Sequence, residues 1–168
     1  MKKLFLVRHA KSSWEDFSIN DKDRPLKASG VQDAYLMSAF LQSINVSPEL
    51  IITSPAARTL STAIIFSQGL LVPLENIKMF SNLYESSPQK ILDVILMTDN
   101  ALSSLMVFGH DPSLTALYTI LTGINIEKIP TSAVASISLN INHWKDLAQG
   151  TGILEFFHKP KEVKSISN

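Results

Sequence analysis

With 168 residues, of which 45% are hydrophobic, the chain is long enough to form one globular domain with a sizeable core. Its 15 basic and 15 acidic residues give a formal net charge of 0, which excludes a general attraction to nucleic acid or to an anionic membrane surface. Cysteine is absent, which excludes disulfides and thiolate metal sites, and no apolar stretch is long enough for a signal peptide or a membrane span. We therefore expect a cytoplasmic protein that binds neither nucleic acid nor membrane.

The chain begins with an apolar run over residues 4–7, which favours a buried strand and stops at the adjacent Arg8 and His9. A cation and an imidazole at a strand end have two interpretations. They are either groups that the strand carries to a functional edge of a sheet, or ordinary solvated loop residues. The rest of the chain is needed to decide between them.

After a polar loop over residues 14–27, the pattern alternates between helices and strands. In that loop Pro25 favours an extended conformation for Arg24, which as a plain loop residue would be solvated and stacked on the proline. Hydrophobic spacing and turn residues then predict helices over residues 28–43, 55–68, 88–96 and 112–122, and strands over residues 50–53, 77–80, 105–108, 134–141 and 153–157.

Three of these helices have a clear start signal, in which a capping residue is followed by proline. The caps are Ser54, Ser87 and Asp111, and proline suits the first turn because its missing N–H has no partner there. This places Arg58 about one turn inside the second helix. Gly123 ends the fourth helix.

Strands that alternate with helices predict an α/β fold, a three-layer α/β/α sandwich whose central sheet is mostly parallel. The last two strands follow each other closely, so we expect one antiparallel pairing. We expect a single domain over residues 1–158, followed by a polar tail over residues 159–168 that frays. Ligands bind at the carboxyl edge of such sheets, and there the fold would bring together Arg8, His9, Arg58 and His110.

Two arginines at one edge predict an anion site, because the guanidinium fork matches pairs of phosphate oxygens and keeps its charge. A histidine among arginines is driven toward its neutral form, which makes it a competent nucleophile for phosphorus. Paired histidines also bind metals. However, the four histidines show no helical metal-binding spacing, and no nucleotide-binding loop is present, so we expect neither metal nor organic cofactor.

These residues carry a resemblance to a known family. The run Leu6-Val7-Arg8-His9-Ala10-Lys11-Ser12 resembles the Arg-His-Gly signature of the histidine phosphatase superfamily, with Ala10 in the usual glycine place. The chain is most similar to the small phosphohistidine phosphatases of the SixA type, whose fold is phosphoglycerate mutase-like. The supporting segments occur in family order and are Asp23-Arg24-Pro25-Leu26, Thr53-Ser54-Pro55-Ala56-Ala57-Arg58-Thr59, Leu83-Tyr84-Glu85, Phe108-Gly109-His110-Asp111-Pro112 and Pro130-Thr131-Ser132-Ala133.

The resemblance implies that His9 is the nucleophile, and that Arg8, Arg58 and His110 surround the phosphoryl group. It also implies that Arg24 reaches the substrate phosphate. Glu85 is the candidate proton donor, although a carboxylate just before a helix is also favoured by the helix dipole. The remaining candidates for substrate binding are Ser12 in the first motif, and Thr131 and Ser132, which could equally be ordinary strand-start residues.

The predicted function is a phosphatase that works through a phosphohistidine intermediate on His9 and acts on phosphohistidine in proteins. Only 51 residues separate Arg58 from His110, which leaves little chain for a lid and favours an open site. Two alternatives stay open. One is a phosphomonoesterase that acts on a small phosphorylated molecule, and the other is a phosphate-binding adaptor without catalysis.

Overall fold

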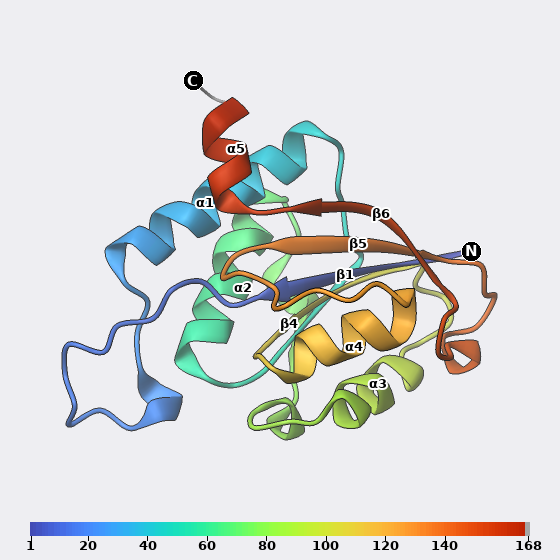
Figure 1. The fold of residues 1–168 in the computed structure, drawn as a ribbon, viewed down its shortest axis with the longest axis horizontal. Helices are drawn as coiled ribbons and strands as arrows, with labels where there is room; N and C mark the ends of the chain where they lie inside the picture. The colour runs from blue at the N-terminus through green and yellow to red at the C-terminus, as the bar shows by residue number, and fades with distance from the viewer. Residues whose placement is uncertain (167–168) are drawn as a thin grey trace.

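The computed structural model describes residues 1–166, which form a six-stranded mixed sheet with helices on both faces (Figure 1). The strands are β1 (Lys2–Arg8), β2 (Leu50–Thr53), β3 (Ile77–Met79), β4 (Ser104–Gly109), β5 (Val134–Leu139) and β6 (Gly152–His158). The helices are α1 (Ala28–Ser43), α2 (Ala57–Gly69), α3 (Pro88–Leu96), α4 (Ser113–Thr122) and α5 (Pro160–Ile166). Within residues 1–166 no helix has both the length and the apolar character needed to cross a membrane.

The strand order is β3-β2-β4-β1-β5-β6, with parallel pairing from β3 to β1. The predicted α/β/α sandwich with a mostly parallel sheet is therefore confirmed. The sheet has two antiparallel pairings instead of the one expected, because β5 lies between β1 and β6 and runs opposite to both. The segment 123–133 contains no helix and leads to the carboxyl end of β1, where β5 begins.

Both faces of the central part of the sheet are buried, which explains why β1, β2 and β4 contain continuous apolar runs rather than alternating ones. One hydrophobic cluster joins Phe5, Val7 and Phe108 to the inner faces of α1 and α2. The other joins Leu4 and Leu6 to α3 and α4. Residues next to each other along β1 thus contribute to opposite layers, and the strand is fixed from both sides up to its end.

Two of the three predicted helix starts lie too early. Helix α2 begins at Ala57, because the Ser54 hydroxyl accepts the Ala56 N–H (3.2 Å) within the turn that precedes the helix. Arg58 is therefore the second residue of α2 rather than a residue one turn inside it. Helix α4 begins at Ser113, and the Asp111 carboxylate accepts a hydrogen bond from the Thr115 hydroxyl (2.8 Å) instead of capping the backbone.

The other helix limits agree more closely with the sequence. Helix α1 has the predicted bounds, and the Ser87 hydroxyl caps α3 by accepting the Lys90 N–H (3.3 Å). Helix α4 ends at Gly123, which adopts the left-handed conformation (φ 73°) that favours glycine at this position.

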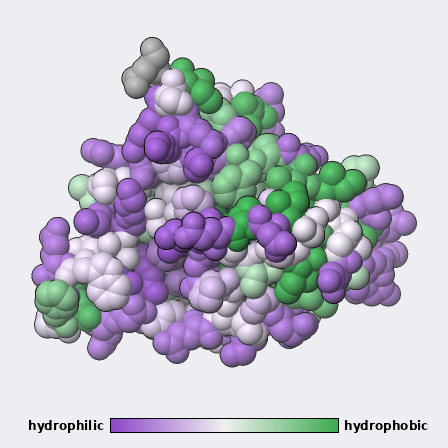
Figure 2. Space-filling view, viewed as in Figure 1, coloured by the Kyte–Doolittle hydropathy of each residue, from purple (hydrophilic) through white to green (hydrophobic). Residues whose placement is uncertain are grey.

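The prediction that the chain frays after residue 158 is wrong for residues 160–166, which form α5 beside α1 (Figure 1). Pro160 suits the first position of a helix, and Val163 is buried in the cluster beneath α1. Lys164 forms an ion pair of 2.6 Å with the buried Asp33 of α1. Much of the outer surface of α5 is hydrophilic, although hydrophobic atoms are exposed at its end, where Ile166 lies (Figure 2). Residues 167–168 of the expected tail lie outside the described residues.

The first turn of α1 contacts the chain that follows β1. The Lys27 N–H donates to the Lys11 carbonyl oxygen (2.8 Å), and Ser12 pairs with Leu26 in an isolated antiparallel bridge. Gly30 lies against the same backbone, where a Cβ atom would be 2.3 Å from the Lys11 carbonyl oxygen. A glycine is required here so that α1 can approach the segment after His9.

We therefore expect Gly30→Ala to lower the free energy of unfolding by about 1–3 kcal/mol, because backbone rather than a flexible side chain must move. Chemical denaturation measures this change. Ser29→Ala, at the exposed neighbouring position of the same turn, is the matched control and is expected to have no destabilising effect. Equal stability of Gly30→Ala and Ser29→Ala would contradict this packing argument.

Candidate active site

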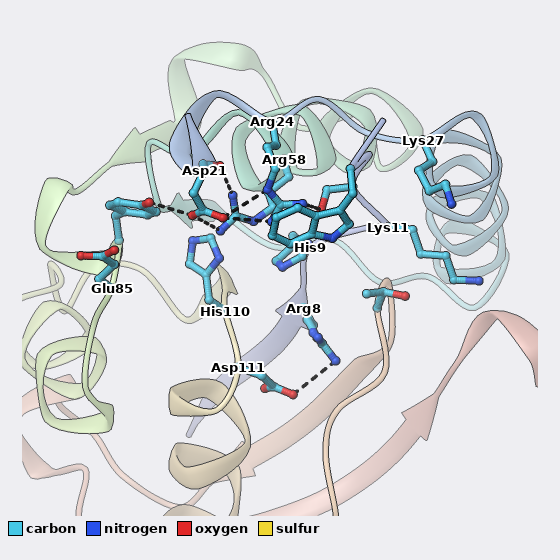
Figure 3. Close-up of a pocket in the computed structure, with 14 residues that line it drawn as sticks. Arg8, His9, Lys11, Asp21, Arg24, Lys27, Arg58, Glu85, His110 and Asp111 are labelled. Carbon is cyan, nitrogen blue, oxygen red and sulfur yellow. Dashed lines mark hydrogen bonds and ion pairs between the residues drawn. The ribbon is translucent and has the colours of Figure 1, made fainter. Parts of the chain in front are cut away.

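A pocket of about 520 Å³ lies at the carboxyl edge of the sheet (Figure 3). Most of the residues predicted for a site line it, from six separate parts of the chain: Arg8, His9, Ser12, Arg24, Arg58, Glu85, His110 and Thr131. The parallel strands explain this convergence, since β1, β2 and β4 all end at this edge. The structure thus favours the functional interpretation of the strand end at Arg8 and His9.

His9 follows β1 directly, and its ring is held by one short hydrogen bond. Its Nδ1 lies 2.8 Å from the carbonyl oxygen of Ala10. A carbonyl oxygen can only accept, so Nδ1 carries the proton and Nε2 keeps its lone pair. Burial, with smaller contributions from the nearby charges of Arg58 and Arg8, lowers the pKa of His9 to about 4 against the opposing effect of the Ala10 bond. The ring is therefore a neutral imidazole with a free nitrogen.

His110 follows β4, and its ring centre lies 5.3 Å from that of His9. Its Nε2 is within hydrogen-bond distance of the hydroxyls of Ser54 (2.9 Å) and Thr59 (3.1 Å). Burial lowers the pKa of His110 to about 3, with further contributions from His9 and Arg58. Both histidines are thus neutral, and the positive charge of the pocket comes from arginine and lysine.

Arg8 and Arg58 are each held at the ends of their guanidinium groups. Arg8 NH1 donates to the Ile129 carbonyl oxygen (2.9 Å) and lies 3.4 Å from Asp111 Oδ2. Arg58 NH1 donates to the carbonyl oxygen of Asp21 (2.6 Å), and NH2 donates to the Asp21 carboxylate (3.1 Å). The Nε atoms of both arginines are buried and have no acceptor within residues 1–166. An anion in the pocket could satisfy such donors.

Arg24 is buried, in contrast to a solvated loop arginine. Its guanidinium carbon lies 3.5 Å from the centre of the Trp14 ring, and NH1 donates to the Ser12 hydroxyl (2.7 Å). Trp14 therefore takes the stacking role that the sequence assigned to Pro25. The loop over residues 14–27 thus turns its arginine inward, toward the pocket that also contains Arg58 and His9.

Asp21 is a functional candidate that the sequence did not single out. Its carboxylate accepts hydrogen bonds from Arg24 Nε (3.1 Å), Arg58 NH2 (3.1 Å) and the Tyr84 hydroxyl (2.7 Å). The hydrogen bond from Tyr84 is the largest cause of a lowered pKa, and with the charge of Arg58 and the hydrogen bonds of Arg58 and Arg24 it brings the pKa of Asp21 to about 2, against the opposing effect of burial. The spacing of Asp21 and Arg24 was an available signal, because residues i and i+3 lie on one side of a 3₁₀ turn.

The other three predicted site residues lie at the rim of the pocket, in its wall and behind it. Glu85 is exposed at the rim in a left-handed conformation (φ 50°), and Thr131 lies half-buried in the wall. Ser132 does not line the pocket but is buried, and its N–H donates to the Arg8 carbonyl oxygen (3.0 Å). Ser132 therefore supports the end of β1 through its backbone, and its buried hydroxyl has no partner within residues 1–166.

Comparisons with known proteins agree with this geometry. Residues 4–85 match the family described as the histidine phosphatase superfamily (branch 1). An uncharacterised protein of Mycobacterium tuberculosis (strain H37Rv) is 30% identical over 165 residues, covering 92% of this chain and 100% of the relative. A chloroplastic protein of Arabidopsis thaliana is 30% identical over 155 residues, covering 86% of this chain and 70% of the relative.

Solved structures show the same fold. A protein histidine phosphatase SixA complexed with tungstate matches with a TM-score of 0.82 and 22% identity, over 96% of this chain and 99% of that one. The SixA protein of Agrobacterium tumefaciens matches with a TM-score of 0.81 and 23% identity, over 95% and 98%. The alpha-ribazole phosphatase of Shigella flexneri matches with a TM-score of 0.69 and 15% identity, over 94% and 96%.

We expect the rings of His9 and His110 to remain neutral, without titrating, between about pH 5.5 and 8. Their lowered pKa values, about 4 and about 3, place protonation below that range. Imidazole NMR signals followed across the pH range test this, with His9→Gln and His110→Gln assigning the two rings. A titration midpoint near 6.5, the ordinary pKa of histidine, for either ring would show that burial and the arginines do not control the protonation of that ring.

Proposed function

Because the chain belongs to the histidine phosphatase superfamily, we propose that it is a phosphatase that removes phosphoryl groups from phosphohistidine in proteins, by way of a phosphorylated His9. The observation that carries the proposal is the 2.8 Å contact between His9 Nδ1 and the Ala10 carbonyl oxygen. It leaves the Nε2 lone pair available in a pocket that contains three arginines. A neutral nucleophile beside fixed positive charge suits attack on an anionic phosphoryl group.

In the first step His9 Nε2 attacks phosphorus in line with the leaving group. The new N–P bond forms as the bond between phosphorus and the leaving nitrogen breaks. Arg8 and Arg58 stabilise the negative charge on the outer oxygens, and their buried Nε atoms gain acceptors. His110 contributes polarity without a further full charge, because its ring is neutral.

In the second step water attacks the phosphorus of the phosphorylated His9. The N–P bond breaks, phosphate leaves with the protons of the water, and the lone pair returns to Nε2, while the other proton of the ring stays on Nδ1, hydrogen-bonded to the Ala10 carbonyl oxygen. No metal or organic cofactor takes part in either step. Arg24 binds the substrate phosphate from the loop, with its guanidinium aligned by Ser12 and Trp14, and Thr131 provides a hydroxyl at the wall.

A protein substrate is supported by the shape of the chain around the pocket. The 51 residues between Arg58 and His110 form the rest of α2, then β3, α3 and β4, which accounts for most of their length. A phosphorylated side chain on another protein can therefore reach His9. The SixA structures, one of them described as a protein histidine phosphatase, also match this fold with higher TM-scores than the S. flexneri alpha-ribazole phosphatase.

We expect His9→Ala to lower turnover at least about 10³-fold, because no other group forms the covalent intermediate. Arg58→Ala is expected to lower kcat about 10²–10³-fold through lost charge stabilisation. The measurements are hydrolysis of phosphohistidine protein, phosphoramidate and a panel of sugar phosphates, with mass spectrometry at neutral pH to find phosphate on His9. His143→Ala, at an exposed histidine outside the pocket, is the matched control and should retain activity. Phosphatase activity at the wild-type level in His9→Ala would contradict the assignment of His9 as the nucleophile.

Glu85→Gln distinguishes substrate classes. A phosphoramidate leaving group is basic and takes its proton from water, whereas an alkoxide leaving group needs a positioned acid. We therefore expect Glu85→Gln to leave hydrolysis of phosphohistidine within about twofold of wild type and to slow hydrolysis of phosphate monoesters by about 10²-fold or more. Equal losses on both substrates would mean that Glu85 is required for the phosphohistidine reaction too.

A further inference from the structure

A second groove, of about 560 Å³, adjoins the catalytic pocket and shares Lys11 and Thr131 with it. It lies between the carboxyl edge of the sheet and helix α5. This placement follows from the topology, because β6 runs in the same direction as β1 and so delivers α5 to the edge where His9 lies (Figure 1). A molecule bound at His9 could therefore continue into this groove.

The charges that line the groove are unbalanced, although the whole chain has a net charge of 0. Four lysines line it, at positions 11, 159, 161 and 164, and Asp33 is the only carboxylate among its lining residues. Asp33 is already paired with Lys164 (2.6 Å), and Lys159 is paired with the partly exposed Glu162 of α5 (3.3 Å), which does not line the groove. Lys11 and Lys161 are exposed, and no ion pair involving either is found within residues 1–166. The groove is thus a local positive surface.

The buried ion pair fixes this surface in place. The Asp33 side chain is 5% exposed, so its charge requires a partner, and Lys164 of α5 provides one. Val163 packs into the core at the preceding position. Helix α5 is therefore a fixed wall of the groove, and its other lysines are held close to the catalytic pocket.

We propose that this groove binds an acidic polypeptide segment that flanks the phosphorylated residue of the substrate. The inference rests on the proposed function, since it assumes a protein substrate. Small anions are bound by donors that converge on one point, as the arginines do around His9. Here the groove is lined by lysines from two separate parts of the chain together with Pro130 and Pro160, which suits an extended chain with carboxylates and apolar atoms.

The test uses two synthetic peptides of equal length, each with one non-hydrolysable phosphohistidine analogue, flanked on both sides by glutamate in one peptide and by glutamine in the other. Fluorescence anisotropy measures their dissociation constants for the full chain. We expect the glutamate peptide to bind at least about threefold more tightly at low salt, and this preference to shrink as salt screens the charges.

Lys159→Gln/Lys161→Gln is the informative variant, because neither lysine lines the catalytic pocket. We expect it to abolish the preference for the glutamate peptide and to leave binding of the glutamine peptide and turnover of phosphoramidate unchanged. The matched control is Lys78→Gln/Lys145→Gln, which removes the same charge from two exposed positions outside both pockets and should keep the preference.

Equal binding of the two peptides by the wild-type chain would overturn the inference, as would a preference that persists in Lys159→Gln/Lys161→Gln. Binding does not require turnover, so the two proposals can fail separately. A chain that prefers the glutamate peptide but hydrolyses no phosphohistidine would refute the proposed function and leave the acidic docking groove supported. A chain that hydrolyses phosphohistidine without any preference would refute the groove alone.

Discussion

The site depends on keeping an imidazole neutral in the middle of positive charge. The guanidinium groups cannot lose their protons, so the histidines do, and burial together with the arginines lowers the pKa of His9 to about 4 and that of His110 to about 3. The carbonyl oxygen of Ala10 then decides which nitrogen of His9 keeps the remaining proton. As the proposed nucleophile, His9 would therefore need no separate general base at neutral pH. Asp21 and Asp111 partly balance the charge of the arginines, which adds to the larger effect of burial.

The topology of the sheet explains why so many separate segments meet at this point. Strands β1, β2 and β4 are parallel and end at one edge, and β5 begins there, so that the N–H of Ser132 can support the Arg8 carbonyl oxygen. Strand β6 runs parallel to β1 and brings α5 to the same edge. The antiparallel strand β5 thus accounts for two features: the backbone support at the end of β1 and the position of the α5 lysines near it.

The sequence could predict those residues of the site that lie at the ends of regular strands and helices. Arg8, His9 and His110 lie at ends of apolar strands, where period and turn residues are informative. Asp21 and Trp14 lie in an irregular loop whose contacts reach residues on other elements, and such contacts leave no periodic signal. The helix at residues 160–166 was missed for a related reason, since its short polar sequence is helical only because Val163 and Lys164 find partners on the domain.

Asp21 also lowers the entropy cost of the phosphate binding that we propose for the loop. An arginine side chain carries about 2 kcal/mol of rotamer entropy, which is lost when it is ordered. The Asp21 carboxylate holds both Arg24 and Arg58, and Trp14 stacks on Arg24, so the two guanidinium groups are already ordered by contacts within the chain. Their entropy loss therefore accompanies folding rather than substrate binding. Since Asp21 is half exposed and carries a single charge, a phosphoryl dianion can compete with it for the same donors while the arginines stay in place.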